Sequence, residues 1–194
     1  MQIVIIKYNA GNIQSVDFAL QRLGIQAEVT GNHEKIKKAD KVIFPGVGEA
    51  STTMHFLKQK KLDQLIPTLT QPVLGICLGM QLMCVNSEEG NTVSLNIFPA
   101  TVKKFPEKAG LKIPHMGWNK VKAQENGIFK VLDEQFVYFV HSYFVPKNKF
   151  TSMTSDYGET FSAAMQRDNF YGVQFHPEKS GEAGASFLQK FIAL

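Results

Sequence analysis

Hydrophobic positions in the first half of the chain alternate between short continuous runs and sets at helical spacing. The run "IVII" at 3–6 is apolar throughout, as in a buried strand, whereas the stretch at 12–24 has apolar residues three or four positions apart and ends at a glycine. This alternation predicts strands at 3–6, 26–30, 41–44 and 72–76, and helices at 12–24, 32–40, 52–69 and from Leu78 onward. Such an order is typical of a parallel sheet covered on both faces.

The second half is dominated by β-type runs separated by turn residues, followed by one amphipathic helix. The runs lie at 100–105, 119–123, 136–145, 151–155, 161–166 and 170–176, and the helix at 181–194. No internal repeat, low-complexity segment or flexible linker divides the chain. We therefore expect one α/β domain, 1–194, with an open, mixed, mainly parallel sheet flanked by helices.

Composition narrows the class of protein. Of the 194 residues, 44% are hydrophobic and 20% charged, the balance of a globular chain. The net charge is +4, but there are only two arginines and the lysines are scattered in pairs. This pattern favours a solvated surface over a nucleic-acid site. A basic patch for an acidic partner or a phosphorylated substrate stays open as an alternative. No apolar segment approaches the roughly 18 residues that span a bilayer, so no membrane partner is expected.

The chain has two cysteines, Cys77 and Cys84, seven positions apart in one predicted helix. This spacing disfavours a disulfide between them, and we expect a reduced, cytoplasmic protein.

The stretch "GICLG" places Cys77 at the predicted junction of a strand and a helix. A sharp turn there exposes a nucleophile, the helix start favours a thiolate, and the free backbone N–H of Leu78 would stabilise an oxyanion. The alternative is a buried cysteine between two packing glycines. Cys84 is expected to be a core residue.

The stretch "GVQFHPE" places His176 and Glu178 two positions apart at the end of a predicted strand. Residues so spaced face the same side of an extended chain, so the carboxylate can orient one imidazole nitrogen and leave the other for a thiol. A structural histidine is the alternative. The pattern favours a Cys-His-Glu triad.

The loop "PGVG" at 45–48 follows the predicted strand at 41–44, at the same sheet edge as Cys77. Its glycines permit a backbone that turns an N–H inward, which makes Val47 and Gly48 candidates for the second oxyanion donor. A plain turn is the alternative.

The remaining histidines have no metal-ligand spacing, and no loop matches a phosphate-binding glycine pattern. The sequence therefore predicts no metal and no organic cofactor.

The pieces "PGVG", "GICLG" and "HPE", in this order, resemble the class I glutamine amidotransferases, and the similarity covers nearly the whole chain. The resemblance implies that Cys77 attacks the side-chain amide of L-glutamine, with His176 as base and acid and Glu178 orienting it. It further implies a pocket for the amino-acid head of glutamine formed by Gln81, Glu89, His141, Ser142 and Tyr143.

Within this family, "KIPHMGWNKV" and "YFVHSYF" are similar to segments of the glutaminases that serve histidine biosynthesis. That branch implies a heterodimer with a (β/α)₈-barrel synthase subunit, which uses the ammonia to form imidazole glycerol phosphate. The partner-facing residues would be Asn12, Met116, Trp118 and Tyr138.

Two positions depart from the family pattern, since the first strand is followed by Lys7 and Asn9 where an acidic residue and a glycine-rich turn are common. These departures leave open a glutaminase of a paralogous pathway, either pyridoxal phosphate synthesis or sugar amidination. A non-catalytic regulatory module on the same fold and a hydrolase or protease with a similar cysteine elbow are further alternatives.

Overall fold

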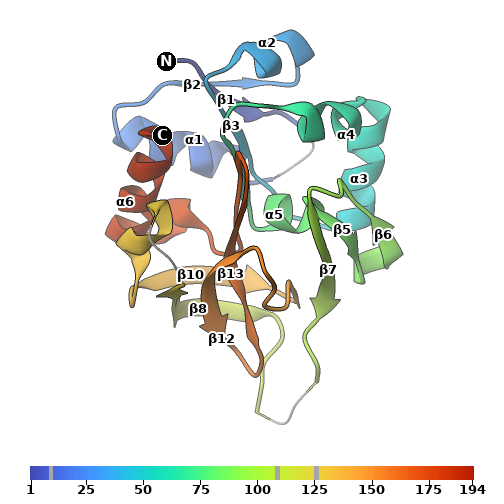
Figure 1. Cartoon of the computed structure of the whole chain (residues 1–194), viewed down its shortest axis with the longest axis vertical. Coiled ribbons are helices and arrows are strands. Elements are labelled where there is room, and N and C mark those ends of the chain that lie inside the picture. The colour runs from blue at the N-terminus through green and yellow to red at the C-terminus, as the bar shows by residue number, and fades with distance from the viewer. Residues whose placement is uncertain (9–10, 108–109, 125–126) are drawn as a thin grey trace.

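An eight-stranded sheet in the order β2-β1-β3-β4-β14-β13-β12-β9 forms the centre of the chain. It is seen in a computed structural model that describes residues 1–8, 11–107, 110–124 and 127–194 (Figure 1). The strands are β1 (Ile3–Ile6), β2 (Ala27–Thr30), β3 (Lys41–Phe44), β4 (Val73–Ile76), β9 (Lys122–Ala123), β12 (Thr151–Asp156), β13 (Thr160–Arg167) and β14 (Phe170–Val173). From β2 to β14 all neighbours are parallel, and the remaining pairs are antiparallel. The predicted mixed, mainly parallel α/β fold is therefore confirmed.

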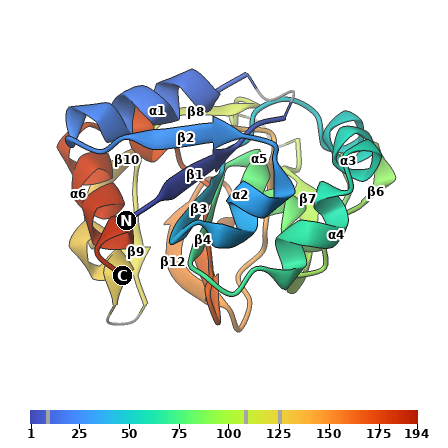
Figure 2. The same ribbon diagram turned by 90° about the horizontal axis from the view of Figure 1, so that it is seen from above.

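Helices cover both faces of this sheet (Figure 2). One face packs against α1 (Ile13–Arg22) and α6 (Gly181–Ile192), and the other against α2 (His33–Lys38), α3 (Ala50–Gln59), α4 (Leu62–Leu65) and α5 (Leu78–Leu82). The alternation of side chains along a strand explains the division, because Ile3 and Ile5 belong to the first core and Val4 and Ile6 to the second. In the described part of the chain, no helix is long and apolar enough to cross a membrane.

Two smaller sheets stand beside the central one. One has the order β11-β7-β5-β6, and the other pairs β10 with β8 in antiparallel register. Their strands are β5 (Cys84–Ser87), β6 (Thr92–Val93), β7 (Phe98–Lys104), β8 (His115–Lys120), β10 (Phe136–His141) and β11 (Tyr143–Phe144). Short 3₁₀ turns complete the fold: η1 (Ile66–Thr68), η2 (Glu89–Asn91), η3 (Ile128–Leu132) and η4 (Pro177–Lys179).

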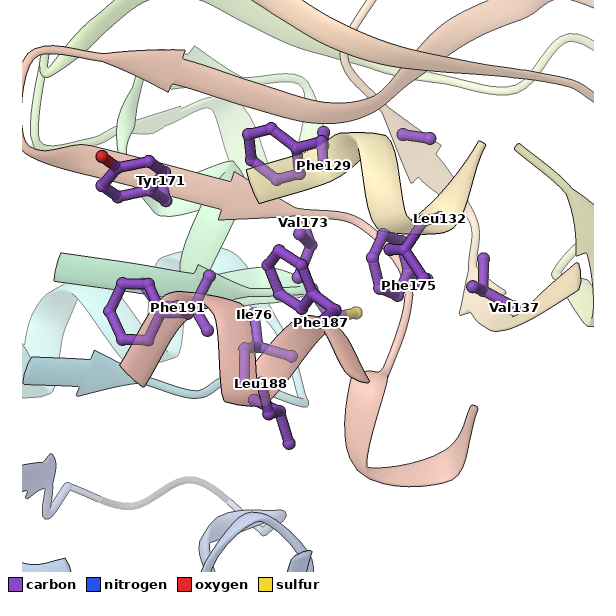
Figure 3. Close-up of a cluster of buried hydrophobic side chains, with 14 of the residues drawn as sticks. Ile76, Phe129, Leu132, Val137, Tyr171, Val173, Phe175, Phe187, Leu188 and Phe191 are labelled. Atoms are coloured by element: carbon purple, nitrogen blue, oxygen red, sulfur yellow. The ribbon is translucent and has the colours of Figure 1, made fainter. Parts of the chain in front are cut away.

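Aromatic packing beneath α6 supports the segment that leads out of β14 (Figure 3). The ring of Phe187 stacks on Phe129 with centroids 5.5 Å apart and meets Phe175 edge-on at 5.9 Å. Burying a side chain of this size contributes roughly 1.5–3 kcal/mol. Because Phe175 immediately precedes His176, this core determines where the histidine lies.

Two predicted helices are wrong in extent. The helix predicted at 52–69 begins earlier, at Ala50, because the Glu49 side chain caps it by accepting from the backbone N–H groups of Ser51 and Thr52. The same helix is interrupted at Lys61, whose φ is 55°. The helix predicted from Leu78 ends at Leu82.

Cys84 therefore lies on a strand rather than two helical turns beyond Cys77. The carbonyls of Leu82 and Met83 accept from N–H groups of the segment at 95–98 instead of continuing the helix. Tertiary hydrogen bonding thus overrides a helical pattern. Both cysteines are free thiols, as predicted.

Candidate active site

Cys77 occupies the sharp turn between β4 and α5. Its φ of 53° and ψ of −110° lie in a region that non-glycine residues rarely adopt, at a cost of about 1–3 kcal/mol. The turn is held because the Cys77 N–H donates to Val173 O at 2.7 Å. It is also crowded, since a Cβ on Gly79 would lie 2.0 Å from the carbonyl oxygen of Phe44. Strain maintained by such packing is typical of a functional turn.

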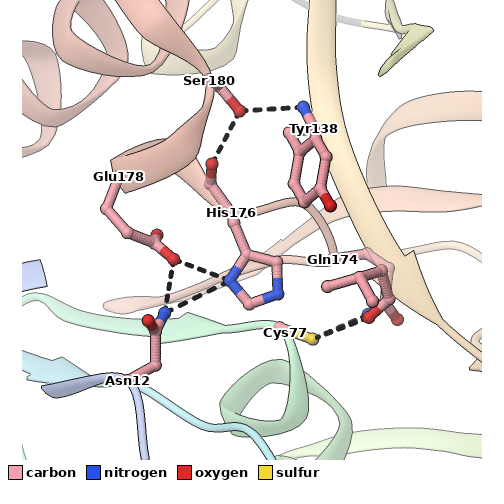
Figure 4. Close-up of polar contacts among 8 residues, drawn as sticks. Asn12, Cys77, Tyr138, Gln174, His176, Glu178 and Ser180 are labelled. Atoms are coloured by element: carbon pink, nitrogen blue, oxygen red, sulfur yellow. Dashed lines mark hydrogen bonds and ion pairs between the residues drawn. The ribbon is translucent and has the colours of Figure 1, made fainter. Parts of the chain in front are cut away.

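His176 and Glu178 form a buried pair next to this turn. The imidazole Nδ1 lies 2.7 Å from Glu178 Oε1, and neither side chain has exposed surface. The Asn12 amide donates to the same carboxylate oxygen. Ser180 Oγ donates to His176 O at 2.7 Å and accepts from the Tyr138 N–H at 3.0 Å. The carboxylate and the backbone thus fix the orientation of the imidazole (Figure 4).

The other imidazole nitrogen faces the sulfur. Figure 4 shows the Nε2 edge of His176 directed toward Cys77, and Nε2 has no hydrogen-bond partner among the described residues. Burial lowers the pKa of His176, but the charges of Cys77 and Glu178 outweigh burial and raise it to about 10. At neutral pH His176 therefore favours the imidazolium form, with a proton ready for a leaving group.

Gln174 is a site residue that the sequence reasoning missed. Its side chain is fully buried, and its Nε2 donates to Cys77 Sγ at 3.6 Å. Its Oε1 accepts from Gln81 Nε2 at 2.8 Å. A signal was available, because Gln174 precedes His176 by two positions in an extended segment and so faces the same side.

A cavity of about 400 Å³ opens in front of Cys77. Pro114 and Val140, which were not predicted, form part of its lining. The other lining residues are those predicted as the nucleophile, the oxyanion donors and the glutamine pocket: Val47, Gly48, Cys77, Leu78, Gln81, Glu89, His141, Ser142 and Tyr143. Glu89 accepts from the Ala50 N–H at 2.8 Å, and burial raises the pKa of its carboxyl. The structure thus gathers segments from five parts of the chain around one thiol.

The backbone N–H of Leu78 is not free, contrary to prediction. It donates to Gly46 O at 3.3 Å. The contact arises because the loop at 45–48 lies directly on α5: a Cβ on Gly46 would be 2.6 Å from Gly79 N and 2.8 Å from the Tyr8 hydroxyl oxygen. Tyr8 itself donates to Pro45 O. In this arrangement a loop carbonyl occupies the N–H that was predicted as an oxyanion donor.

The other predicted residues lie outside the cavity. Met116 and Trp118 are 63% and 56% exposed, and the Trp118 ring meets that of Tyr138 at 6.1 Å. Asn12, expected to face a partner, is 6% exposed and bound to Glu178, so a partner-facing role for it stays a prediction. Lys7 is exposed, and Asn9 lies outside the described residues. No group of His, Cys, Asp and Glu able to hold a metal occurs in the described ranges.

A pair of buried histidines supports the wall of the cavity. His141 Nδ1 donates to Tyr143 O at 2.7 Å, so its Nε2 accepts from His115 Nδ1 at 2.9 Å. Asn119 Nδ2 lies 3.4 Å from the remaining nitrogen of His115. Burial lowers the pKa of His115 to about 4 and that of His141 to about 3. Both rings are therefore neutral at pH 7.

The free energy of unfolding is expected to fall as the pH drops below about 6.5. The unfolded histidines take up protons there, whereas the native pair stays neutral until about pH 4, so stability present above pH 6.5 is lost through this window. Urea titrations at pH 7.5 and 5 measure the loss. His115→Gln should reduce the difference in the free energy of unfolding between the two pH values, whereas His55→Gln, at an exposed histidine, should leave it unchanged. An equal pH dependence in the two variants would contradict the role of the buried histidine pair.

Comparison with known proteins identifies the family. The chain matches Glutamine amidotransferase class-I over residues 4–194. It is 58% identical over 196 residues to the imidazole glycerol phosphate synthase subunit HisH of Bacteroides fragilis, with both chains fully covered. The corresponding subunit of Pasteurella multocida is 51% identical over 98% of this chain and 96% of its own.

Solved structures agree in fold. PurLQS from Thermotoga maritima superposes with a TM-score of 0.75 at 15% identity, over 99% of this chain and 97% of that chain. At that identity the likeness speaks for the fold alone. The family-model match over residues 4–194 and the full-length identity to the Bacteroides fragilis subunit show that the chain belongs to the class I glutamine amidotransferase family.

Proposed function

We propose that the chain hydrolyses L-glutamine to glutamate and ammonia through Cys77, His176 and Glu178, and passes the ammonia to a synthase subunit in histidine biosynthesis. The observation that carries this proposal is the buried His176–Glu178 pair, 2.7 Å between Nδ1 and Oε1, beside a cysteine on a strained turn that faces a cavity. Packing alone requires none of these three together.

The proposed reaction depends on the protonation state of His176. The Cys77 thiolate adds to the carboxamide carbon, and His176, protonated at neutral pH, gives its proton to the departing ammonia. Neutral His176 then removes a proton from water, which hydrolyses the glutamyl thioester to glutamate. Glu178 holds the imidazole through Nδ1 and stabilises its charged form.

Gln81 and Glu89 fit the ammonium group of the substrate. Both N–H bonds of the Gln81 amide are used, one toward Tyr143 O at 2.9 Å and one toward Gln174. Only its oxygen is left to contact a ligand in the cavity, and an acceptor suits an ammonium. The carboxylate of Glu89, on the same cavity wall, adds negative charge.

The loop at 45–48 is the proposed point of control. With Gly46 O on the Leu78 N–H, the oxyanion lacks one donor, and losing one such donor typically costs about 10²–10³-fold in rate. A change of the loop that withdraws this carbonyl would complete the site. Coupling it to the partner's nucleotide ligand would prevent loss of ammonia.

The partner surface we propose is the outer face of β8 and β10. Met116 and Trp118 are exposed there beside Tyr138, and Lys179 lies 5.9 Å from the Tyr138 ring centroid. An exposed aromatic group of this kind is common at protein interfaces. The relatives are named as subunits of imidazole glycerol phosphate synthase, which supports another synthase subunit as the partner. That this subunit is a (β/α)₈ barrel and that the assembly is a heterodimer is what the resemblance to the histidine-pathway glutaminases implies.

Glutamate release tests the proposal. It is measured with the chain alone, with the barrel subunit, and with the subunit plus its nucleotide ligand; we expect slow release alone and strong stimulation in the third condition. No release in any condition, with the complex shown to form, would overturn the activity. Stimulation only by the synthase of pyridoxal phosphate synthesis or of sugar amidination would keep the glutaminase and reassign the pathway.

A further inference from the structure

We propose that Gln174 is a further catalytic residue of this site, whose side-chain amide stabilises the Cys77 thiolate and links it to the substrate-binding Gln81. The inference rests on the proposed glutaminase function for its role in turnover. The contact that carries it is the 3.6 Å hydrogen bond from Gln174 Nε2 to Cys77 Sγ (Figure 4).

The direction of this hydrogen bond is determined by a backbone carbonyl. Tyr143 O can only accept, so the Gln81 group 2.9 Å from it must be the NH₂ end of the amide. The second hydrogen of that NH₂ then points to Gln174, 2.8 Å away, and requires an acceptor there. Gln174 must therefore present Oε1 to Gln81 and its own NH₂ to the sulfur.

Burial makes the arrangement costly unless the amide is used. Gln174 is 0% exposed, and its backbone is fixed by an N–H bond to Ala163 O at 2.9 Å. Leaving such an amide unpaired costs about 1–3 kcal/mol. Among the described residues, the acceptor that the structure shows for Gln174 Nε2 is Cys77 Sγ.

The amide discriminates between the two forms of the thiol. A thiol sulfur is a weak acceptor and a thiolate a strong one, so an N–H aimed at Sγ stabilises the charged form selectively. The Nε2 edge of His176 is directed toward the same sulfur. Because Gln174 and Gln81 share a hydrogen bond, a ligand that holds Gln81 also orders the donor to the nucleophile.

The test is the rate at which iodoacetamide alkylates Cys77 in the isolated chain, followed by mass spectrometry across the pH range. Gln174→Met removes the donor at similar side-chain length. We expect alkylation about tenfold slower at pH 7, with the difference disappearing at alkaline pH, where the thiol ionises without help. Gln166→Met, on neighbouring β13, is the matched control and should react at the wild-type rate.

Two outcomes overturn the inference: wild-type alkylation in Gln174→Met, or equal slowing in Gln166→Met. Should Gln174→Met fail to fold, Gln174→Glu keeps the shape and places a carboxylate near the sulfur, and the same slowing is expected at pH 7. The assay needs no glutamine turnover. A failed glutaminase assay on the wild-type chain therefore speaks against the proposed function, and unchanged alkylation against the role of Gln174.

Discussion

Replacing Cys77 with alanine is expected to abolish glutamine hydrolysis by the stimulated complex, by at least about 10⁴-fold. No other thiol can substitute for it, because Cys84 is fully buried on β5 and burial raises the pKa of its thiol, which keeps it protonated. Glutamate release under saturating partner and nucleotide ligand measures the effect.

Cys84→Ala is the matched control, since it removes the other thiol from the same short stretch of sequence. It should retain turnover close to wild type, with a stability loss of about 1 kcal/mol from the small cavity. Substantial hydrolysis by Cys77→Ala, or loss of turnover in Cys84→Ala with the fold intact, would contradict the assignment of the nucleophile.

Gly79→Ala is expected to destabilise the chain by about 3 kcal/mol. The added Cβ would lie 2.0 Å from the carbonyl oxygen of Phe44, and both are backbone-anchored in the core of the site, so neither α5 nor β3 can move away cheaply. Denaturant unfolding, followed by fluorescence of the single tryptophan, gives the difference in free energy.

Gly24→Ala separates this clash from backbone strain. Gly24 has a φ of 75° and no atom within 4 Å of an added Cβ, so only the left-handed conformation should cost stability, by about 1 kcal/mol. If the two variants lose equal stability, the close approach of α5 to β3 is not the reason that residue 79 is glycine.

The parallel half of the sheet and the place of Cys77 on the turn between β4 and α5 could be predicted because both depend on local pattern. Apolar runs of four residues separated by amphipathic stretches indicate buried strands and covering helices, and a cysteine between glycines at such a junction has little alternative geometry. His176 and Glu178 followed from the two-residue period of an extended chain. These inferences need no knowledge of what lies opposite in space.

What could not be predicted depends on partners distant in sequence. The helix after Cys77 ends at Leu82 because carbonyls there bind the segment at 95–98, and the Leu78 N–H is occupied by Gly46, 32 positions earlier. The two-residue period places Gln174 on the same face as His176, but what its amide does depends on contacts with Gln81 and Cys77 across 93 and 97 positions. Side-chain amides show their role only when their neighbours are known.

The pairing of β4 with β14 joins the segments of Cys77 and His176, which lie far apart in the sequence, so the candidate site can form only after both have been synthesised. Asn12 and Glu178, which share a hydrogen bond, are 166 positions apart, so the contacts around the thiol are among the most non-local in the chain. Contacts of that kind form late in folding. During synthesis at about 5–20 residues per second, roughly ten seconds separate Cys77 from Glu178. On the proposed assignment, a nascent chain therefore carries the nucleophile Cys77 without its base His176, and releases no ammonia before it is nearly complete.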